Sequence, residues 1–144
     1  MNIMNICKLE KSDRIEYIEL ISSFRPLDID ISEEVFNKIY DEIFKTDKIF
    51  VCKIDNVIIG TAKLLIEQKF IHNLSKYGRI EDVIVKNEYR NKGIGTKLIN
   101  FIINYCKKYK FFKISLTCSS DLIKFYEKNN FEVYQINMSQ LINN

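Results

Sequence analysis

The segment Arg90–Gly95, which reads Arg-Asn-Lys-Gly-Ile-Gly, has the composition of a phosphate-binding loop. Glycine lets backbone N–H groups turn toward a ligand without a side chain in the way. The helix expected to begin near Thr96 would add the positive end of its dipole, and Arg90 and Lys92 would add charge. The sequence therefore predicts an anion site suited to a pyrophosphate.

Other phosphate-binding motifs fit this segment less well. A Walker A loop needs the string G-x-x-x-x-G-K-[ST], which the chain lacks. A dinucleotide fingerprint needs a third glycine at the position that Leu98 occupies. What remains is R-x-x-G-x-G after a strand, which resembles the acetyl-CoA loop of the GNAT acetyltransferases. The alternative is a glycine turn with surface charge, and the order of the flanking elements disfavours it.

The order of expected elements predicts an α/β fold. Asp55-Asn56 separates two β-rich runs and predicts a two-residue hairpin. Strands joined by short turns are antiparallel, whereas a strand–helix–strand unit makes its two strands parallel. We therefore expect one domain over residues 1–144, with a mixed, mostly antiparallel sheet and helices on both faces. The expected strands are 3–8, 48–54, 57–66, 79–86, 112–118 and 131–138, and the expected helices begin at Ser12 or Asp13, at Ser32, at Thr96 and after Ser119-Ser120-Asp121.

The composition restricts the class of protein. A chain of 144 residues that is 47% hydrophobic can bury one core without disulfides, and a net charge of +3 is too small to predict nucleic-acid binding. With one histidine and no C-x-x-C pair, no metal site is expected. The cysteines, at positions 7, 52, 106 and 118, are expected to be buried free thiols. Without a signal peptide or a long apolar run, the chain is expected to be a soluble cytoplasmic protein.

Three blocks narrow the resemblance to one branch of the GNAT superfamily. Residues Gly60–His72, Gly78–Val85 and Phe125–Phe131 are similar to the glucosamine-6-phosphate N-acetyltransferases, in the order and spacing of that family. The resemblance covers residues 57–138 and is weak over the first 50 residues. It implies acetyl-CoA as acyl donor, direct attack of the sugar amine in a ternary complex, and a homodimer that binds a small molecule. The charge and the lack of a long apolar run predict no nucleic-acid or membrane partner.

The resemblance also implies the site residues. Tyr126 would protonate the departing thiolate and contact acetyl-CoA. The other residues implied for acetyl-CoA are Asp82, Val83, Ile84, Val85, Arg90, Asn91, Lys92, Gly93, Ile94, Gly95 and Thr96. Those implied for the sugar phosphate are Lys69, Phe70, Ile71, His72, Glu81 and Asp82.

These residues suit the chemistry of amine acetylation. A protonated amine cannot attack, so a group must accept its proton, and Glu81, Asp82 or a backbone carbonyl acting through water could do so. A backbone N–H near Val83 could stabilise the developing oxyanion. Each assignment has an alternative: Tyr126 as a core aromatic, Glu81 and Asp82 as exposed edge charges, and His72 as a loop residue.

Two positions depart from the family pattern. Thr117 stands where many members carry an acid with an orienting role, and Leu141 stands where familiar members place an arginine that reaches the sugar phosphate of the partner subunit. Phosphate recognition must then be reorganised, and Arg25 and Lys113 are candidates. Two other functions remain open: an acetyltransferase for another small amine or a protein amine, and a non-catalytic acetyl-CoA-binding module.

Overall fold

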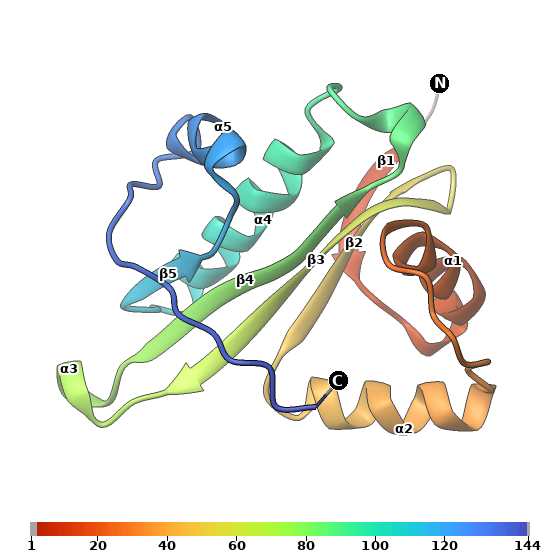
Figure 1. Cartoon of the computed structure of the whole chain (residues 1–144), viewed down its shortest axis with the longest axis horizontal. Helices are drawn as coiled ribbons and strands as arrows, with labels where there is room; N and C mark the ends of the chain where they lie inside the picture. The colour runs from red at the N-terminus through yellow and green to blue at the C-terminus, as the bar shows by residue number, and fades with distance from the viewer. Residues whose placement is uncertain (1–2, 144) are drawn as a thin grey trace.

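A five-stranded sheet forms the frame of the protein, for which a computed structural model describes residues 3–143 (Figure 1). Neighbouring strands follow the order of the sequence, and all pair antiparallel except the last two. The parallel pair is joined by a crossover helix, as expected. The strands are β1 (Met4–Lys8), β2 (Lys48–Ile54), β3 (Val57–Gln68), β4 (Lys76–Val85) and β5 (Lys113–Leu116).

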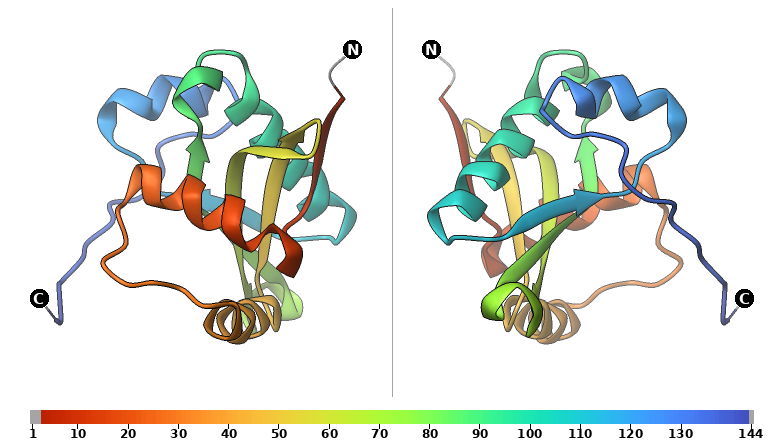
Figure 2. Two further views of the ribbon diagram at one scale, coloured as in Figure 1. Left: turned by 90° about the vertical axis from the view of Figure 1, so that its right-hand side faces the viewer. Right: turned by 90° about the vertical axis from the view of Figure 1, so that its left-hand side faces the viewer.

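Helices cover both faces of this sheet, as the sequence predicted (Figure 2). On one face lies α4 (Ile94–Lys108), whose buried side chains pack with those of β2, β3 and β4, and α5 (Ile123–Glu127) adds Tyr126 to the same core. On the other face α1 (Arg14–Phe24) and α2 (Glu33–Phe44) form a second core with β2 and β3. The sheet thus separates two apolar cores.

Local signals explain where several of these elements begin and turn. The Ser32 hydroxyl accepts a hydrogen bond of 3.3 Å from the Val35 N–H and caps α2, as predicted. Asp55 and Asn56 have φ of 48° and 68°, the left-handed values that a type I′ hairpin needs at both central residues. The predicted hairpin is therefore confirmed, with its register fixed by Ile54 opposite Val57.

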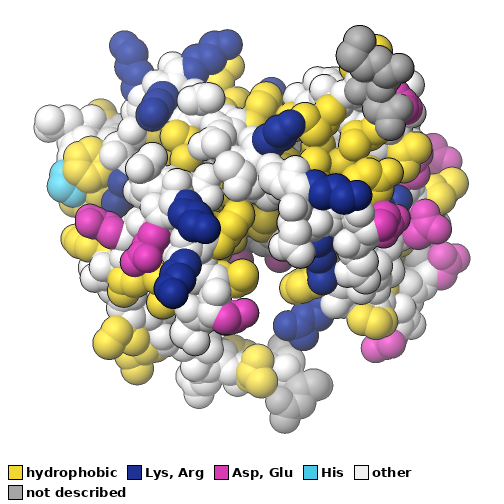
Figure 3. Space-filling view, turned by 90° about the horizontal axis from the view of Figure 1, so that it is seen from above, with side chains coloured by type: hydrophobic (Ala, Val, Ile, Leu, Met, Phe, Trp, Pro, Cys, Tyr) yellow, Lys and Arg dark blue, Asp and Glu magenta, His cyan; other side chains and the backbone are white. Residues whose placement is uncertain are grey.

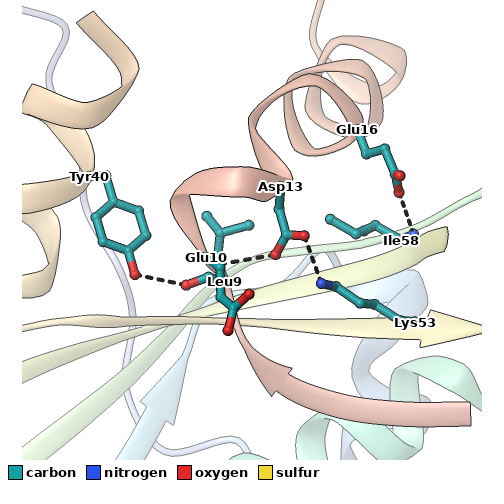
Figure 4. A network of polar contacts seen from close by, with 7 residues as sticks. All are labelled: Leu9, Glu10, Asp13, Glu16, Tyr40, Lys53 and Ile58. Atoms are coloured by element: carbon teal, nitrogen blue, oxygen red, sulfur yellow. Dashed lines mark hydrogen bonds and ion pairs between the residues drawn. The ribbon is translucent and has the colours of Figure 1, made fainter. Parts of the chain in front are cut away.

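A polar network fastens the start of α1 to the sheet (Figure 4). Asp13 accepts from the Glu10 N–H at 3.0 Å and from the Lys53 ammonium at 2.7 Å, while Glu16 accepts from the Ile58 N–H at 2.9 Å. Burial alone would lower the pKa of Lys53, but the hydrogen bond and charge of Asp13 outweigh it and raise the pKa. A short 3-10 turn, Lys11–Asp13, precedes the helix, so Asp13 serves the sheet as well as the helix start.

A β-bulge interrupts β4 at its acidic residues. Glu81 lies opposite Lys63 and Ile84 lies opposite Thr61, so Asp82 and Val83 together face a single residue of β3. Asp82 has a φ of 52°. Before the bulge Ile80 packs toward α4, and after it Val83 and Val85 do so, whereas Ile84 packs toward α1 and α2.

The predicted last strand, 131–138, is wrong. These residues have no regular secondary structure and their backbone makes no hydrogen bond beyond Phe131 within the described chain. The side chains of Val133, Tyr134, Ile136 and Met138 are 72–92% exposed. An alternating apolar pattern forms a strand only where a neighbouring edge pairs with it, and here the outer edge of β5 stays unpaired.

Other boundaries differ by a few residues. β4 begins at Lys76 instead of Arg79, β5 is shorter than the predicted 112–118, and α4 begins at Ile94 instead of Thr96. The polar stretch after β3 contains a short turn of helix, α3 (Ile71–Leu74), with left-handed residues inside it.

The cysteines of the chain are free, but only Cys52 and Cys106 are buried, whereas Cys7 and Cys118 are half-buried. Burial raises the pKa of the Cys106 thiol to about 12, which keeps it protonated and unreactive. Within residues 3–143 no helix is long and apolar enough to cross a membrane. In the same range no group of three or more His, Cys, Asp and Glu side chains could hold a metal ion.

Truncation of Leu98 tests the core under α4. This side chain is 0% exposed and packs against the backbone of Gly60, where a Cβ would lie 3.2 Å from Leu98 Cδ1. Leu98→Ala would leave a cavity there and should lower the free energy of unfolding by about 2–5 kcal/mol. Asn100→Ala, on the exposed side of the same helix, should change it by about 0.5 kcal/mol or less. Urea denaturation measures both, and equal effects would contradict this description of the core.

Candidate active site

The strands β4 and β5 part at the centre of the candidate site. Their parallel pairing runs from Tyr77 opposite Lys113 to Ile80 opposite Leu116, where β5 ends. Beyond this point residues 81–85 of β4 have no strand neighbour on the β5 side among the described residues. Backbone N–H and C=O groups on such an edge can pair with an extended ligand.

The N-terminus of α4 faces solvent beyond the end of β4. Gly93 is the N-cap with a φ of 79°, and the Lys97 N–H makes the first helical hydrogen bond, to the Gly93 carbonyl at 3.0 Å. The N–H groups of residues 94–96 precede that bond and lack helical partners. With exposed Arg90 and Lys92 beside them, these donors have the geometry of a phosphate site.

The surface around this loop is cationic and partly apolar. Figure 3 looks onto this end of the molecule and shows Lys and Arg side chains across it, with apolar atoms exposed between them. Arg90 donates through Nε to the Val85 carbonyl at 3.2 Å and so fastens the loop to the end of β4. The Lys92 ammonium lies 5.5 Å from the centre of the Tyr89 ring. The cationic loop is therefore anchored to the end of β4.

The two glycines of the loop have different structural roles. At position 93 the left-handed backbone favours glycine, although a Cβ there would meet no atom within 4 Å. A Cβ on Gly95 would lie 3.3 Å from the Phe125 ring, so this glycine lets α5 approach α4 closely. The sequence reasoning attributed both glycines to ligand access.

Two other predicted acetyl-CoA residues, Ile84 and Ile94, have side chains that are only 5% exposed, so only their backbone is open to contact with a ligand.

Tyr126 lies on α5, which follows the end of β5. Its ring is 9% exposed and packs edge-on against Phe125 and Phe131, with centroids 4.9 Å and 6.0 Å away. Burial, and secondarily the Cys118 thiol, raise the pKa of its phenol above the ordinary value near 10. Tyr126 is therefore part of the core and also keeps its proton at neutral pH, which a general acid requires.

The acidic pair Glu81-Asp82 lies where the strands part. Arg79 donates through Nε to Glu81 Oε1 at 2.5 Å and through Nη2 to Thr117 Oγ1 at 2.7 Å. Asp82, on the bulge, is exposed. The sequence reasoning missed Arg79, although residues two apart on a strand share a face and Arg79 was therefore bound to lie beside Glu81.

Tyr17 of α1 is a second residue that the sequence reasoning missed. It packs edge-on against Phe36, with ring centroids 6.4 Å apart. Burial and, secondarily, the nearby Asp82 charge raise the pKa of its phenol to about 12, although a hydrogen bond with Thr61 acts in the opposite direction. No local signal marked this tyrosine, because its surroundings come from α2 and from the sheet, far away in the sequence.

The remaining predicted substrate residues form a separate group at the other end of β4. The ammonium groups of Lys69 and Lys113 lie 5.1 Å and 5.0 Å from the centre of the Tyr77 ring, and His72 stacks on Phe112 at 4.0 Å. Phe70 and Ile71 are 93% and 61% exposed. Tyr77 precedes Glu81 by four residues, about 13 Å along a strand.

The lysines near Tyr77 and the more distant Arg25 differ in their interaction partners. Lys69 is paired with Glu67 at 2.6 Å, whereas Lys113 has no carboxylate within 4 Å among the described residues and lies over the rings of Tyr77 and Tyr134. Arg25 follows the end of α1, and its guanidinium lies 5.7 Å from the Phe24 ring. Of the two phosphate candidates, Lys113 is thus the one that lies near the other predicted substrate residues.

Comparison with known proteins decides the family. Residues 15–131 match the model of the acetyltransferase (GNAT) family. The chain belongs to this family. Acetyl-CoA is the acyl donor of GNAT acetyltransferases, and the open edge of β4 and the unpaired N–H groups of residues 94–96 fit an extended, pyrophosphate-bearing ligand.

Individual relatives match this GNAT acetyltransferase over most of its length. It is 34% identical over 141 residues to the glucosamine 6-phosphate N-acetyltransferase of Arabidopsis thaliana, with 94% of both chains covered. It is 36% identical over 139 residues to glucosamine 6-phosphate N-acetyltransferase 1 of Dictyostelium discoideum, with 81% and 88% covered. The crystal structure of the Arabidopsis thaliana enzyme superposes with a TM-score of 0.90 at 32% identity, covering 98% and 99% of the chains.

Proposed function

We propose that this GNAT acetyltransferase transfers the acetyl group of acetyl-CoA to the amine of D-glucosamine 6-phosphate, giving N-acetylglucosamine 6-phosphate for the synthesis of UDP-N-acetylglucosamine. The observation that carries the proposal is the near full-length similarity to relatives named for this reaction. The geometry supports it, because the open edge of β4 leads to the N-terminus of α4, and Gly95 there contacts Phe125, which packs against the protonated Tyr126.

The proposed reaction is a direct transfer. The thioester supplies the acetyl group, the amine nitrogen forms the new C–N bond, and the C–S bond breaks. Glu81 or Asp82 accepts the proton that the amine loses, and the backbone N–H near Val83 donates to the carbonyl oxygen as it gains charge. Tyr126 gives its proton to the departing sulfur, and its raised pKa keeps that proton available.

We assign the sugar phosphate to the lysines around Tyr77, whose long side chains must turn toward Glu81, about 13 Å away along the strand, because the amine and the phosphate belong to one small sugar. Lys69, His72 and Lys113 lie together there, and Lys113 has no carboxylate partner among residues 3–143. A cation without an anionic neighbour is the better phosphate ligand, because it need not first give up an ion pair. In this assignment, Lys113 takes the phosphate-binding role of the arginine that familiar family members carry at the position of Leu141.

A homodimer in the cytoplasm completes the proposal. The chain after Tyr134 projects from the body of the molecule (Figure 2), the side chains of Ile136, Met138, Leu141 and Ile142 are exposed, and β5 keeps an unpaired outer edge. Each copy therefore offers both an apolar segment that could pair as a strand and an edge that could receive one. Free cysteines suit a reducing compartment. A net charge of +3 suits a small anionic substrate and is too small to argue for nucleic acid as the partner.

Thiol release from acetyl-CoA tests the substrate. The purified protein should turn over glucosamine 6-phosphate far faster than glucosamine, because the phosphate adds charge-assisted contacts. A lysine peptide and an aminoglycoside complete the panel. Turnover of another amine and none of glucosamine 6-phosphate would show a GNAT enzyme with a different acceptor, and no turnover of any amine with intact acetyl-CoA binding would show a non-catalytic module.

Removal of the Tyr126 hydroxyl tests the general acid. Tyr126→Phe should lower kcat by about 100-fold or more, with little change in the Kd for acetyl-CoA. Because the folded-state pKa is raised above its ordinary value near 10, the unmodified enzyme should show no loss of activity from this phenol below that pH. Tyr105→Phe, a half-buried tyrosine of α4, is the matched control. Equal kcat in the two variants would remove Tyr126 from this role.

Light scattering after size-exclusion chromatography tests the homodimer. The whole chain should have twice the mass of 17.1 kDa, and a chain that ends at Glu132, which keeps Phe131 in the core, should be monomeric. Ile136→Asp, in an apolar residue that is 92% exposed, should weaken the dimer without unfolding the domain, because the side chain contributes nothing to either core. A monomeric whole chain at every concentration would overturn this part of the proposal.

A further inference from the structure

We propose that Arg79 is a positioning residue that fixes Glu81 as the orienting carboxylate of the reaction, so that this carboxylate comes from β4 and not from position 117 on the β5 side. The inference rests on the proposed acetyl transfer to an amine. It concerns a residue that lies within the Gly78–Val85 block but for which the resemblance implied no role.

The guanidinium of Arg79 spans the point where the strands part. Arg79 lies opposite Ser115 in the parallel ladder, which ends one pair later. Glu81 is the first residue of β4 beyond the ladder, and Thr117 is the first residue after β5. Hydrogen bonds of 2.5 Å from Nε to Glu81 and 2.7 Å from Nη2 to Thr117 therefore join the two sides of the opening.

The charges around Glu81 make Arg79 its sole close cation among residues 3–143. Lys63 of β3 is opposite Glu81 in the register, but its ammonium is directed to Asp47, 3.8 Å away. Arg79 binds only one oxygen of Glu81, and the described chain gives the other oxygen no hydrogen-bond partner. That second oxygen is free to meet the amine of the acceptor.

The threonine at position 117 is what directs the positive charge of Arg79 to Glu81. An acid at this position would lie against the same guanidinium nitrogen and would compete with Glu81 for it. A threonine hydroxyl accepts one hydrogen bond from Arg79 and adds no charge. Because the guanidinium is planar and rigid, two bonds fix its plane, and with it the direction of the Glu81 carboxylate.

The position of this group argues against a purely structural role. The side chains of Arg79 and Glu81 are 39% and 38% exposed, and an ion pair in such surroundings contributes about 1 kcal/mol or less to stability. The apolar cores on both faces of the sheet do not include either residue. An arginine that does little for the fold but joins two residues at the opening of the strands is better explained by the reaction.

A double-mutant cycle on kcat tests this inference. Arg79→Gln should lower kcat by about 10- to 100-fold through misplacement of Glu81, while the KM for the amine stays within about threefold. Arg79→Lys should recover part of the loss, since one ammonium can reach Glu81. The variant with both Arg79→Gln and Glu81→Gln should be no slower than Glu81→Gln alone, because both act through one carboxylate. Independent, multiplying losses would overturn the inference.

Substitutions at Thr117 provide the matched controls. Thr117→Val should cost only a few-fold in kcat, because the pair with Glu81 survives. Thr117→Asp should lower kcat in the unmodified background, because it draws Arg79 from Glu81, and should raise kcat in the Glu81→Gln background, because it restores a carboxylate at the opening. A rise in both backgrounds would place the preferred carboxylate at position 117 and contradict the inference.

A phosphate-binding role for Arg79 is the competing explanation. In that case Arg79→Gln would raise the KM for glucosamine 6-phosphate at least tenfold, leave the KM for glucosamine unchanged and spare kcat, which would also overturn the inference. The cycle is run with whichever amine the unmodified enzyme acetylates. A wrong acceptor therefore fails the proposed substrate separately, and thermal melting of each variant confirms that it is folded.

Discussion

The bulge in β4 is the constraint on which the rest of the structure depends. In an uninterrupted strand, Asp82 would share a face with Ile80 and point into the apolar core beneath α4. The extra residue places Asp82 in solvent and brings Val83 to that core instead. Two acidic residues thus lie inside an apolar strand without either being buried. Burial of an unpaired carboxylate in the core would lower the stability of the fold by several kcal/mol or more.

The donor site and the tyrosine are linked through packing. Gly95 at the start of α4 admits the ring of Phe125, which is the neighbour of Tyr126 on α5. A larger residue at position 95 would press on the tip of the Phe125 ring, which would have to shift. The glycine loop and the helix that carries Tyr126 are therefore in direct contact through Gly95 and Phe125.

The parts of the fold that could be predicted from the sequence are those with local causes. The cap at Ser32, the turn at Asp55-Asn56 and the helix after the glycine loop each depend on residues a few positions apart. The parallel pair followed from the crossover alone. In the candidate site, the glycine loop and the acidic pair were visible for the same reason.

What could not be predicted depends on contacts between distant segments. The bulge has no sequence signal of its own, since its register is set by β3. The position of the Arg79 guanidinium depends on a hydrogen bond to Thr117, 38 positions away, and the pKa of Tyr17 depends on Asp82 and Thr61. Residues 131–138 carry the alternation of a strand but find no partner in the described chain. Patterns of apolar residues report burial and say little about which neighbour provides it.

The short last strand and the projecting C-terminal segment have a consequence for assembly at high concentration. A segment that leaves the body after Phe131 can be donated reciprocally between two copies, which closes the assembly, or passed from each copy to the next, which leaves both ends open. The same edge that allows a finite pair is therefore also the point from which a fibre could grow.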